Sequence, residues 1–124
     1  MKYFVMFLLM MSPVGAFAHQ WTPTYPELRK SYVDKVLVTD LELFNSRNDV
    51  SYFVIEVFDE DWKSVQFATT EDVFNIPFLK RKKVSVYIRE SDRFKARYIC
   101  SRSKILSEGT TKAMVSSRIC SKIK

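Results

Sequence analysis

Glycine and histidine are scarce in this chain of 124 residues, which contains two glycines, one histidine, two cysteines and four prolines. So little glycine and proline excludes collagen-like and low-complexity sequences. A single histidine and two cysteines exclude most metal clusters and scaffolds held by several disulfides. After the first 18 residues, no stretch is apolar enough to span a membrane.

What the chain does have is apolar area and positive charge. Hydrophobic residues make up 47% and aromatic residues 15% of the sequence, which suits a packed core and argues against disorder. Lysine and arginine number 20 against 14 aspartates and glutamates, so the formal net charge is +6. Because the length fits about one domain, we expect a small, basic, well-packed unit.

The first 18 residues have the order of a secretory signal peptide. Lys2 supplies positive charge, an unbroken apolar run occupies 4–11, and Ala-Phe-Ala at 16–18 places small residues before a cleavage point. The apolar run is much shorter than the roughly 20 residues of a membrane-spanning helix. We therefore expect a signal peptide at 1–18 and an exported single domain at 19–124.

Apolar residues alternate with polar ones along several segments, which is the pattern of half-buried β-strands. Strands are expected at 37–43, 52–58, 65–68, 84–88, 96–105 and 112–123. Turn-forming residues separate them, and the basic run at 80–83 is interpreted as a solvated turn. About seven strands without a convincing amphipathic helix predict an all-β fold, a small β-sandwich.

The two cysteines, Cys100 and Cys120, fall in the last two expected strands. Export would place them where a disulfide persists. If the two cysteines face each other, the residue numbers of every cross-strand pair in this hairpin add up to 220. The centre of the hairpin then falls at Thr110, beside Gly109, where a tight turn is expected. Neighbours at a non-hydrogen-bonded site are close enough for a bridge. We predict a Cys100–Cys120 disulfide, with two free buried thiols as the alternative.

The same register pairs Ile105 with Val115 on one face of the hairpin and gathers basic residues on the cysteine face. These basic residues are Arg102, Lys104, Arg118 and Lys122. Arg102 then lies opposite Arg118, and like charges in direct opposition destabilise a sheet. Either an acidic partner compensates them or the long side chains extend into water, where exposed charges are screened. We favour the second interpretation.

Groups suited to catalysis are few. A nucleophilic triad needs a base beside the nucleophile, and the single histidine, His19, stands at the expected mature N-terminus. The acidic pairs at 59–61 and 71–72 are interpreted as solvated turns, and neither a glycine-rich phosphate loop nor a zinc spacing is present. We expect no enzyme and no cofactor. The excess of basic over acidic residues would suit binding to nucleic acid, but the expected export of the protein argues against this function.

His19 offers the N-terminal amine and imidazole with which some secreted copper sites begin. Copper favours several nitrogen ligands, and the sequence contains no second histidine. We therefore prefer the interpretation that His19 is an incidental first residue, and no metal site is expected.

Several segments resemble the N-terminal domain of periplasmic pilus chaperones, an immunoglobulin-like sandwich. The resemblance is carried by 41–46 (LELFNS), 52–57 (YFVIEV), 73–77 (VFNIP), 83–88 (KVSVYI), 96–105 and 113–122. These segments resemble the family's second and third strands, a proline-containing segment with the strand after it, and its last two strands. The resemblance covers most of 19–124 and implies an immunoglobulin-like β-sandwich of about seven strands. Some family members link the last two strands by a disulfide.

The resemblance implies an exported, non-enzymatic domain that binds a protein partner, such as a pilus or surface subunit, by strand addition at an exposed sheet edge. The candidate edge is the last strand, where Ala113, Val115 and Ile119 alternate with polar residues. Family members carry a second sandwich domain, so this would be a single-domain version.

The family anchors its subunit through an Arg on the first strand and a Lys on the last. Arg29 is similar in place to the first of these residues, and Lys122 or Arg118 to the second. The alternative functions are a structural or decoration protein of an envelope or particle surface and, third, a copper carrier using His19. The identity of the partner and the oligomeric state stay open.

Overall fold

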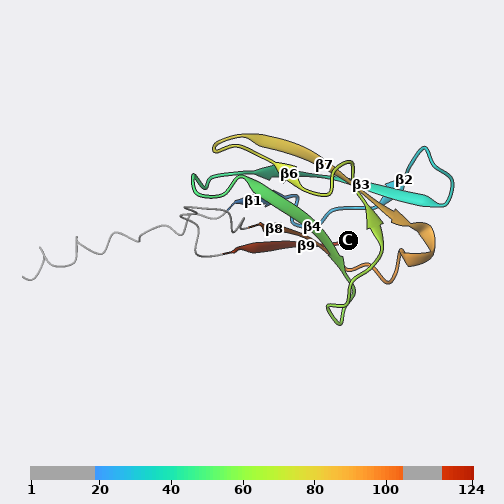
Figure 1. Cartoon of the computed structure of the whole chain (residues 1–124). Coiled ribbons are helices and arrows are strands. Elements are labelled where there is room, and N and C mark those ends of the chain that lie inside the picture. Colours follow the sequence, from blue (N-terminus) through green and yellow to red (C-terminus); the bar gives the residue numbers. More distant parts are fainter. Residues whose placement is uncertain (1–18, 105–115) are drawn as a thin grey trace, which may run out of the picture.

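The computed structural model describes residues 19–104 and 116–124, so the expected signal peptide at 1–18 lies outside the described residues. The elements of the described part are β1 (Gln20–Thr22), β2 (Arg29–Lys30), β3 (Val36–Phe44), β4 (Tyr52–Phe58), β5 (Phe67–Ala68), β6 (Phe74–Asn75), β7 (Arg81–Arg89), the 3₁₀ turn η2 (Glu90–Asp92), β8 (Tyr98–Ser103) and β9 (Arg118–Lys122) (Figure 1). Within these ranges no helix is long and apolar enough to cross a membrane. The all-β prediction is confirmed.

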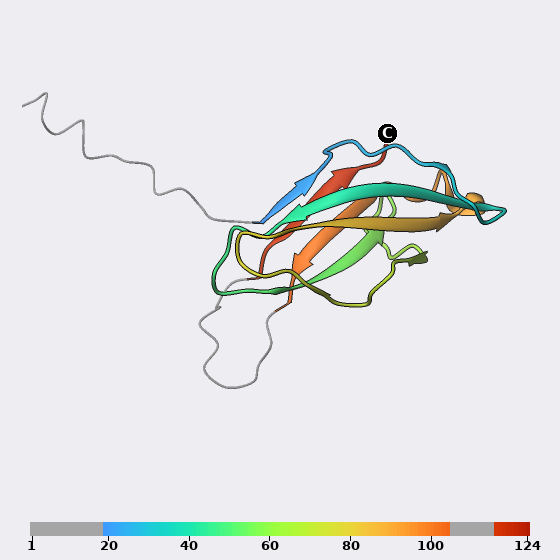
Figure 2. The same ribbon diagram turned by 90° about the horizontal axis from the view of Figure 1, so that it is seen from above.

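The strands form two antiparallel sheets that face each other as a sandwich (Figure 1), and the strands of the two sheets overlap when seen from above (Figure 2). The first sheet has the order β1-β3-β7-β5, and β2 pairs with the other half of β3. The second sheet has the order β6-β4-β8-β9, which places β9 at its edge. This is the two-sheet β-sandwich expected from the sequence.

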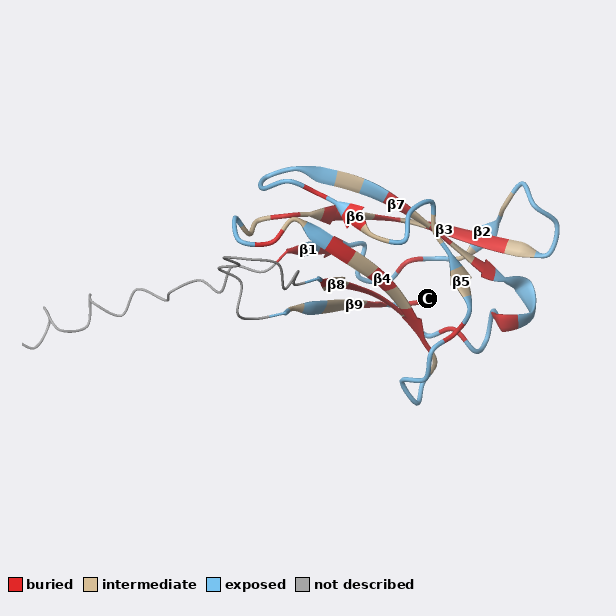
Figure 3. Ribbon diagram, viewed as in Figure 1, coloured by how far each residue is buried: buried red, intermediate tan, exposed pale blue. Residues whose placement is uncertain are grey.

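The core lies between the sheets and comes from the alternation seen in the sequence. Successive side chains of a strand point to opposite faces, so β-branched and aromatic residues at every second position form one apolar face. The inward residues of the three long strands are buried: Leu37, Leu41, Leu43, Phe53, Ile55, Val57, Val84, Val86 and Ile88. In Figure 3 the buried positions follow the strands, and the exposed positions gather in the connecting turns.

The basic run at 80–83 is mostly strand rather than turn, so that prediction is wrong. β7 already begins at Arg81 and pairs with β3 along all nine residues of both strands. Arg81 bonds to Glu42 at 3.0 Å and Lys82 to Glu71 at 2.7 Å. Because carboxylates from neighbouring segments offset these cations, the strand continues through the charged run.

Three short strands, β1, β2 and β6, were not expected, and within the described residues the last two strands are shorter than predicted. The alternation at 96–105 yields strand only for Tyr98–Ser103, and the last expected strand is described as Arg118–Lys122. The predicted turn at Thr110 and the Ile105–Val115 pair lie outside the described residues, as does Ala113.

Candidate functional site

The candidate edge expected from the sequence, β9, lies at the edge of the second sheet. Within the described ranges it pairs along its length only with β8. Its neighbours at both ends bond towards β8, because Ser103 N–H donates to the Ser117 carbonyl and Ile123 N–H donates to the Arg97 carbonyl. Backbone groups alternate in direction along an antiparallel strand. Those of Arg118, Cys120 and Lys122 therefore point away from the sheet.

One half of this edge is covered by the chain that follows β1. Lys122 N–H donates to the Thr24 carbonyl at 3.0 Å, and Lys124 N–H donates to the Pro26 carbonyl at 2.9 Å. Among the residues that the structure describes, the outward N–H and C=O groups of Arg118 and Cys120 have no such backbone partner. The open part of the edge therefore consists of 118–120.

The predicted disulfide between Cys100 and Cys120 is confirmed, and so is the register on which it was based. The two Cα atoms are 4.0 Å apart, as expected for a non-hydrogen-bonded pair. Cys100 is fully buried, whereas Cys120 is half-buried on the edge strand. The bridge thus ties the open part of β9 to the centre of the second sheet.

Replacing both cysteines with serine should lower the free energy of unfolding by about 1–3 kcal/mol and leave the fold intact. The bridge spans a sequence separation of 20, for which chain entropy gives roughly 3 kcal/mol. A hairpin shares some of that local ordering with its unfolded state, which reduces the effect. Urea unfolding followed by circular dichroism measures the change. An unchanged midpoint in the double variant would contradict a stabilising bridge.

The two opposed arginines, Arg102 and Arg118, share one carboxylate instead of extending into water. Their predicted opposition is confirmed, but Glu56 of β4 accepts from the Nε atoms of Arg102 at 3.2 Å and Arg118 at 3.1 Å. The Arg118 guanidinium also lies over the Phe58 ring, 5.3 Å from its centroid. Our preference for screening by water was wrong, because the neighbouring strand supplies the compensating charge.

The remaining residues proposed for partner binding are divided between the core and the surface. Ile119 is half-buried and packs against the core, whereas Lys104 and Lys122 are exposed. Ala113 and Val115 lie outside the described residues. Of the predicted set, the structure therefore brings together four basic side chains and one apolar side chain around β8 and β9.

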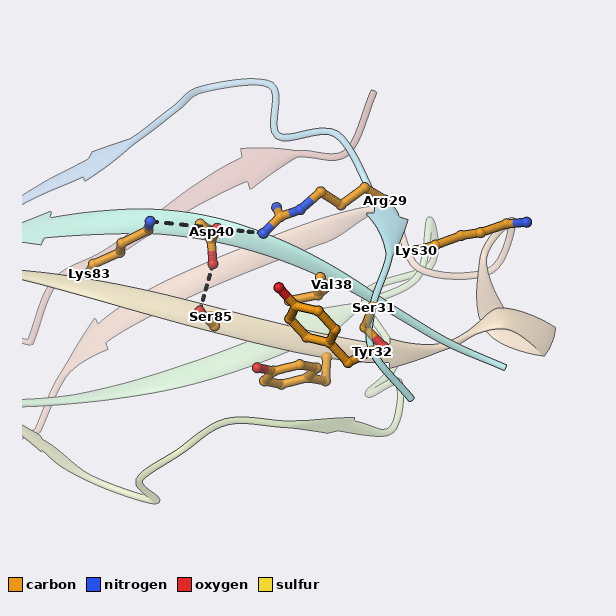
Figure 4. A pocket seen from close by; sticks show the side chains of 9 residues that line it. Arg29, Lys30, Ser31, Tyr32, Val38, Asp40, Lys83 and Ser85 are labelled. Atoms are coloured by element: carbon orange, nitrogen blue, oxygen red, sulfur yellow. Dashed lines mark hydrogen bonds and ion pairs between the residues drawn. The ribbon is translucent and has the colours of Figure 1, made fainter. Parts of the chain in front are cut away.

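Arg29 lies elsewhere, on the outer face of the first sheet. It lines a hollow of about 560 Å³ and donates to Asp40 at 2.7 Å (Figure 4). Asp40 also accepts from the Ser85 hydroxyl and lies 3.7 Å from the Lys83 ammonium. The Ser85 hydrogen bond, followed by that of Arg29, lowers the pKa of Asp40.

The Arg29 guanidinium forms an ion pair with Asp40 of the first sheet, whereas Arg118 and Lys122 lie on β9 of the second sheet. The two-residue anchor implied by the resemblance stays a prediction.

His19 is a core residue, which corrects the interpretation that it is incidental. It is 1% exposed. Its Nε2 lies 2.8 Å from the Ser101 hydroxyl and 3.2 Å from the Ser101 carbonyl, and its Nδ1 lies 3.1 Å from the Ser117 hydroxyl. A carbonyl only accepts, so Nε2 carries the proton and Nδ1 accepts from Ser117. Both ring nitrogens of His19 thus have hydrogen-bond partners, on β8 and just before β9.

Lowering the pH from about 7.5 to about 5 should destabilise the fold through His19. Burial, with a smaller contribution from the charge of Arg47, lowers the pKa of His19 below its ordinary 6.5. The unfolded chain therefore binds a proton below pH 6.5 while the folded chain does not, and the free energy of unfolding falls by up to about 1.4 kcal/mol per pH unit.

Urea unfolding at several pH values tests this effect, with His19→Gln as the control because an amide does not titrate. The pKa values of Asp40 and Asp49 are lowered from 3.8. The stability that these two carboxylates contribute is therefore lost only at a pH below the range of this experiment. An equal slope in the wild type and His19→Gln between pH 7.5 and 5 would contradict the assignment to His19.

The fold is an immunoglobulin-like β-sandwich, and two solved structures of PapD-like domains share it. It is similar to the crystal structure of the E. coli chaperone DraB, with a TM-score of 0.64 and 16% identity over 86% of this chain and 53% of DraB. It is also similar to the ASH/PapD-like domain 7 of human CEP192, with a TM-score of 0.52 and 11% identity over 92% of this chain and 89% of that domain. The chain thus spans about half the length of DraB. No protein-family model and no curated protein sequence matches it.

Proposed function

We propose that this chain is an exported, non-enzymatic protein-binding domain that accepts a strand of a partner protein, such as a pilus or surface subunit, at the open edge of β9. The observation that carries the proposal is the pair of outward backbone groups at Arg118 and Cys120. Strand addition uses such unpaired groups for main-chain hydrogen bonds. The chaperone-like fold supports the same conclusion.

The disulfide and the expected signal peptide at 1–18 together favour the periplasm or the secreted fraction, because such bridges persist in oxidising compartments. The Cys100–Cys120 bridge also suits the proposed mechanism. An edge strand that must accept a partner loses less entropy on binding if it is already held in extended form.

Replacing Arg118 with proline should abolish partner binding while the domain stays folded. The Arg118 N–H points away from β8, so proline removes an outward donor without breaking the β8–β9 ladder, a position that an edge strand tolerates. Arg118→Ala is the matched control because it removes the same side chain and keeps the N–H. The measurement is co-purification of an envelope subunit with each tagged full-length protein.

Capture by the wild type and Arg118→Ala, but not by Arg118→Pro, is the expected result, with unfolding curves confirming that all three proteins fold. Equal capture by Arg118→Pro would contradict strand addition at this edge. A stable homo-assembly without any bound subunit would instead favour the structural or decoration protein.

A further inference from the structure

Positive charge dominates the outer face of the second sheet beside the open edge. The outward positions of β4, β8 and β9 hold one acidic residue, Glu56, and three basic residues, Arg102, Arg118 and Lys122. The exposed Lys104 follows β8 directly. The acidic turn at 59–61 follows β4, and no ion pair joins it to these cations among the described residues. The face therefore carries an excess of positive charge.

Arg118 is the cation of this face that can most easily serve a partner. It shares Glu56 with Arg102, so one carboxylate serves two guanidinium groups. The Arg118 side chain is 45% exposed, and exposed ion pairs contribute little. If Arg118 turned towards the edge, Arg102 would keep Glu56 at 3.2 Å. No buried charge would be left unpaired.

We propose that the strand added to β9 carries an acidic side chain beside Arg118 and an apolar side chain beside Ile119. This inference rests on the proposed function. Directly opposed residues of neighbouring strands have Cβ atoms about 5 Å apart, within reach of an ion pair. Ile119 points to the other face and packs against the core, so the adjacent position of the partner strand faces the same apolar surroundings.

The covered half of the edge limits the register of this strand. Thr24 and Pro26 already accept from Lys122 and Lys124, so the added strand pairs with 118–120 and ends before Lys122. Lys122 lies on the same face as Arg118 but beyond the open edge. It is therefore the matched control position, because a charge reversal there changes the net charge equally.

The test uses three labelled seven-residue peptides of alternating isoleucine and threonine, whose central threonine is replaced by Glu, Gln or Lys, so that a strand centred on Arg118 ends before Lys122. Their affinity for the full chain is measured by fluorescence anisotropy at about 0.15 M salt, where charges beyond about 8 Å are screened. We expect the Glu peptide to bind about fivefold more tightly than the Lys peptide, with Gln between them.

Two variants of Arg118 and one control variant of Lys122 assign the preference to a residue. Arg118→Glu should reverse it in favour of the Lys peptide, and Arg118→Gln, which keeps the length of the side chain without its charge, should remove it. Lys122→Glu should retain the preference for the Glu peptide. Unfolding curves establish that each variant is folded.

The outcomes separate this inference from the proposed function. Equal binding of the three peptides by the wild type would overturn the acidic preference and leave strand addition in place. Reversal by Lys122→Glu as complete as that by Arg118→Glu would also overturn it, because the effect would come from net charge. If no peptide bound, strand addition and the inference would fail together.

Discussion

Replacing Trp21 with alanine should lower the free energy of unfolding by about 3–5 kcal/mol, the usual range for removing a buried tryptophan side chain. Trp21 is 5% exposed and belongs to the core. Its indole Nε1–H donates to the Ile99 carbonyl at 3.0 Å, so β1 of the first sheet is bonded to β8 of the second. The variant would lose both the packing and this link between the sheets.

Urea unfolding followed by circular dichroism measures this effect, provided the transition is two-state. Trp62→Ala is the matched control. Trp62 stacks on Tyr98 with ring centroids 4.3 Å apart but is 52% exposed, so its loss should cost about 1 kcal/mol. Equal destabilisation by the two variants would contradict the role assigned to Trp21.

Replacing Asn45 with alanine should cost about 2–4 kcal/mol, because it leaves buried carbonyl groups without partners. Asn45 is fully buried, and its amide donates to the Val50 carbonyl at 2.7 Å and the Ile76 carbonyl at 2.8 Å. Its side-chain oxygen accepts from Arg47 N–H at 2.9 Å. One side chain therefore joins the end of β3, the turn before β4 and the segment after β6.

The exposed Asn48 of the same turn provides the control, since Asn48→Ala should change the free energy of unfolding by less than about 0.5 kcal/mol. Asn45→Asp should be at least as damaging as Asn45→Ala, because it loses the donor and buries a charge. A fully stable Asn45→Ala would show that the carbonyls of Val50 and Ile76 find other partners.

The long strands could be predicted because alternation is a local property. β4 spans the expected residues and β3 extends one residue beyond them at each end, whereas β7 begins three residues before its expected start. β1 and β2 were missed since three and two residues are too few to show a period. The hydrogen bond from Asn45 to the Ile76 carbonyl was not predicted, because 31 residues separate the two positions.

The candidate site, like the fold, could be predicted only where its contacts lie within one hairpin. The strand, the disulfide and the opposition of Arg102 and Arg118 follow from counting positions along one hairpin. Their acceptor Glu56 lies 46 and 62 residues away from them. No spacing within the hairpin indicates a residue that a different strand brings beside it.

The amino-acid sequence by itself determined the fold class, the inward faces of the long strands and the pairing of Cys100 with Cys120. These features depend on the alternation of residues along one strand or on the register of one hairpin, and both can be read from positions close together in the chain. Only the tertiary structure decided which part of β9 is open, since Thr24 and Pro26 arrive from the other end of the chain. It likewise decided that His19 is buried. Such contacts join segments about a hundred residues apart, and they depend on how the two sheets meet rather than on any local preference of the residues.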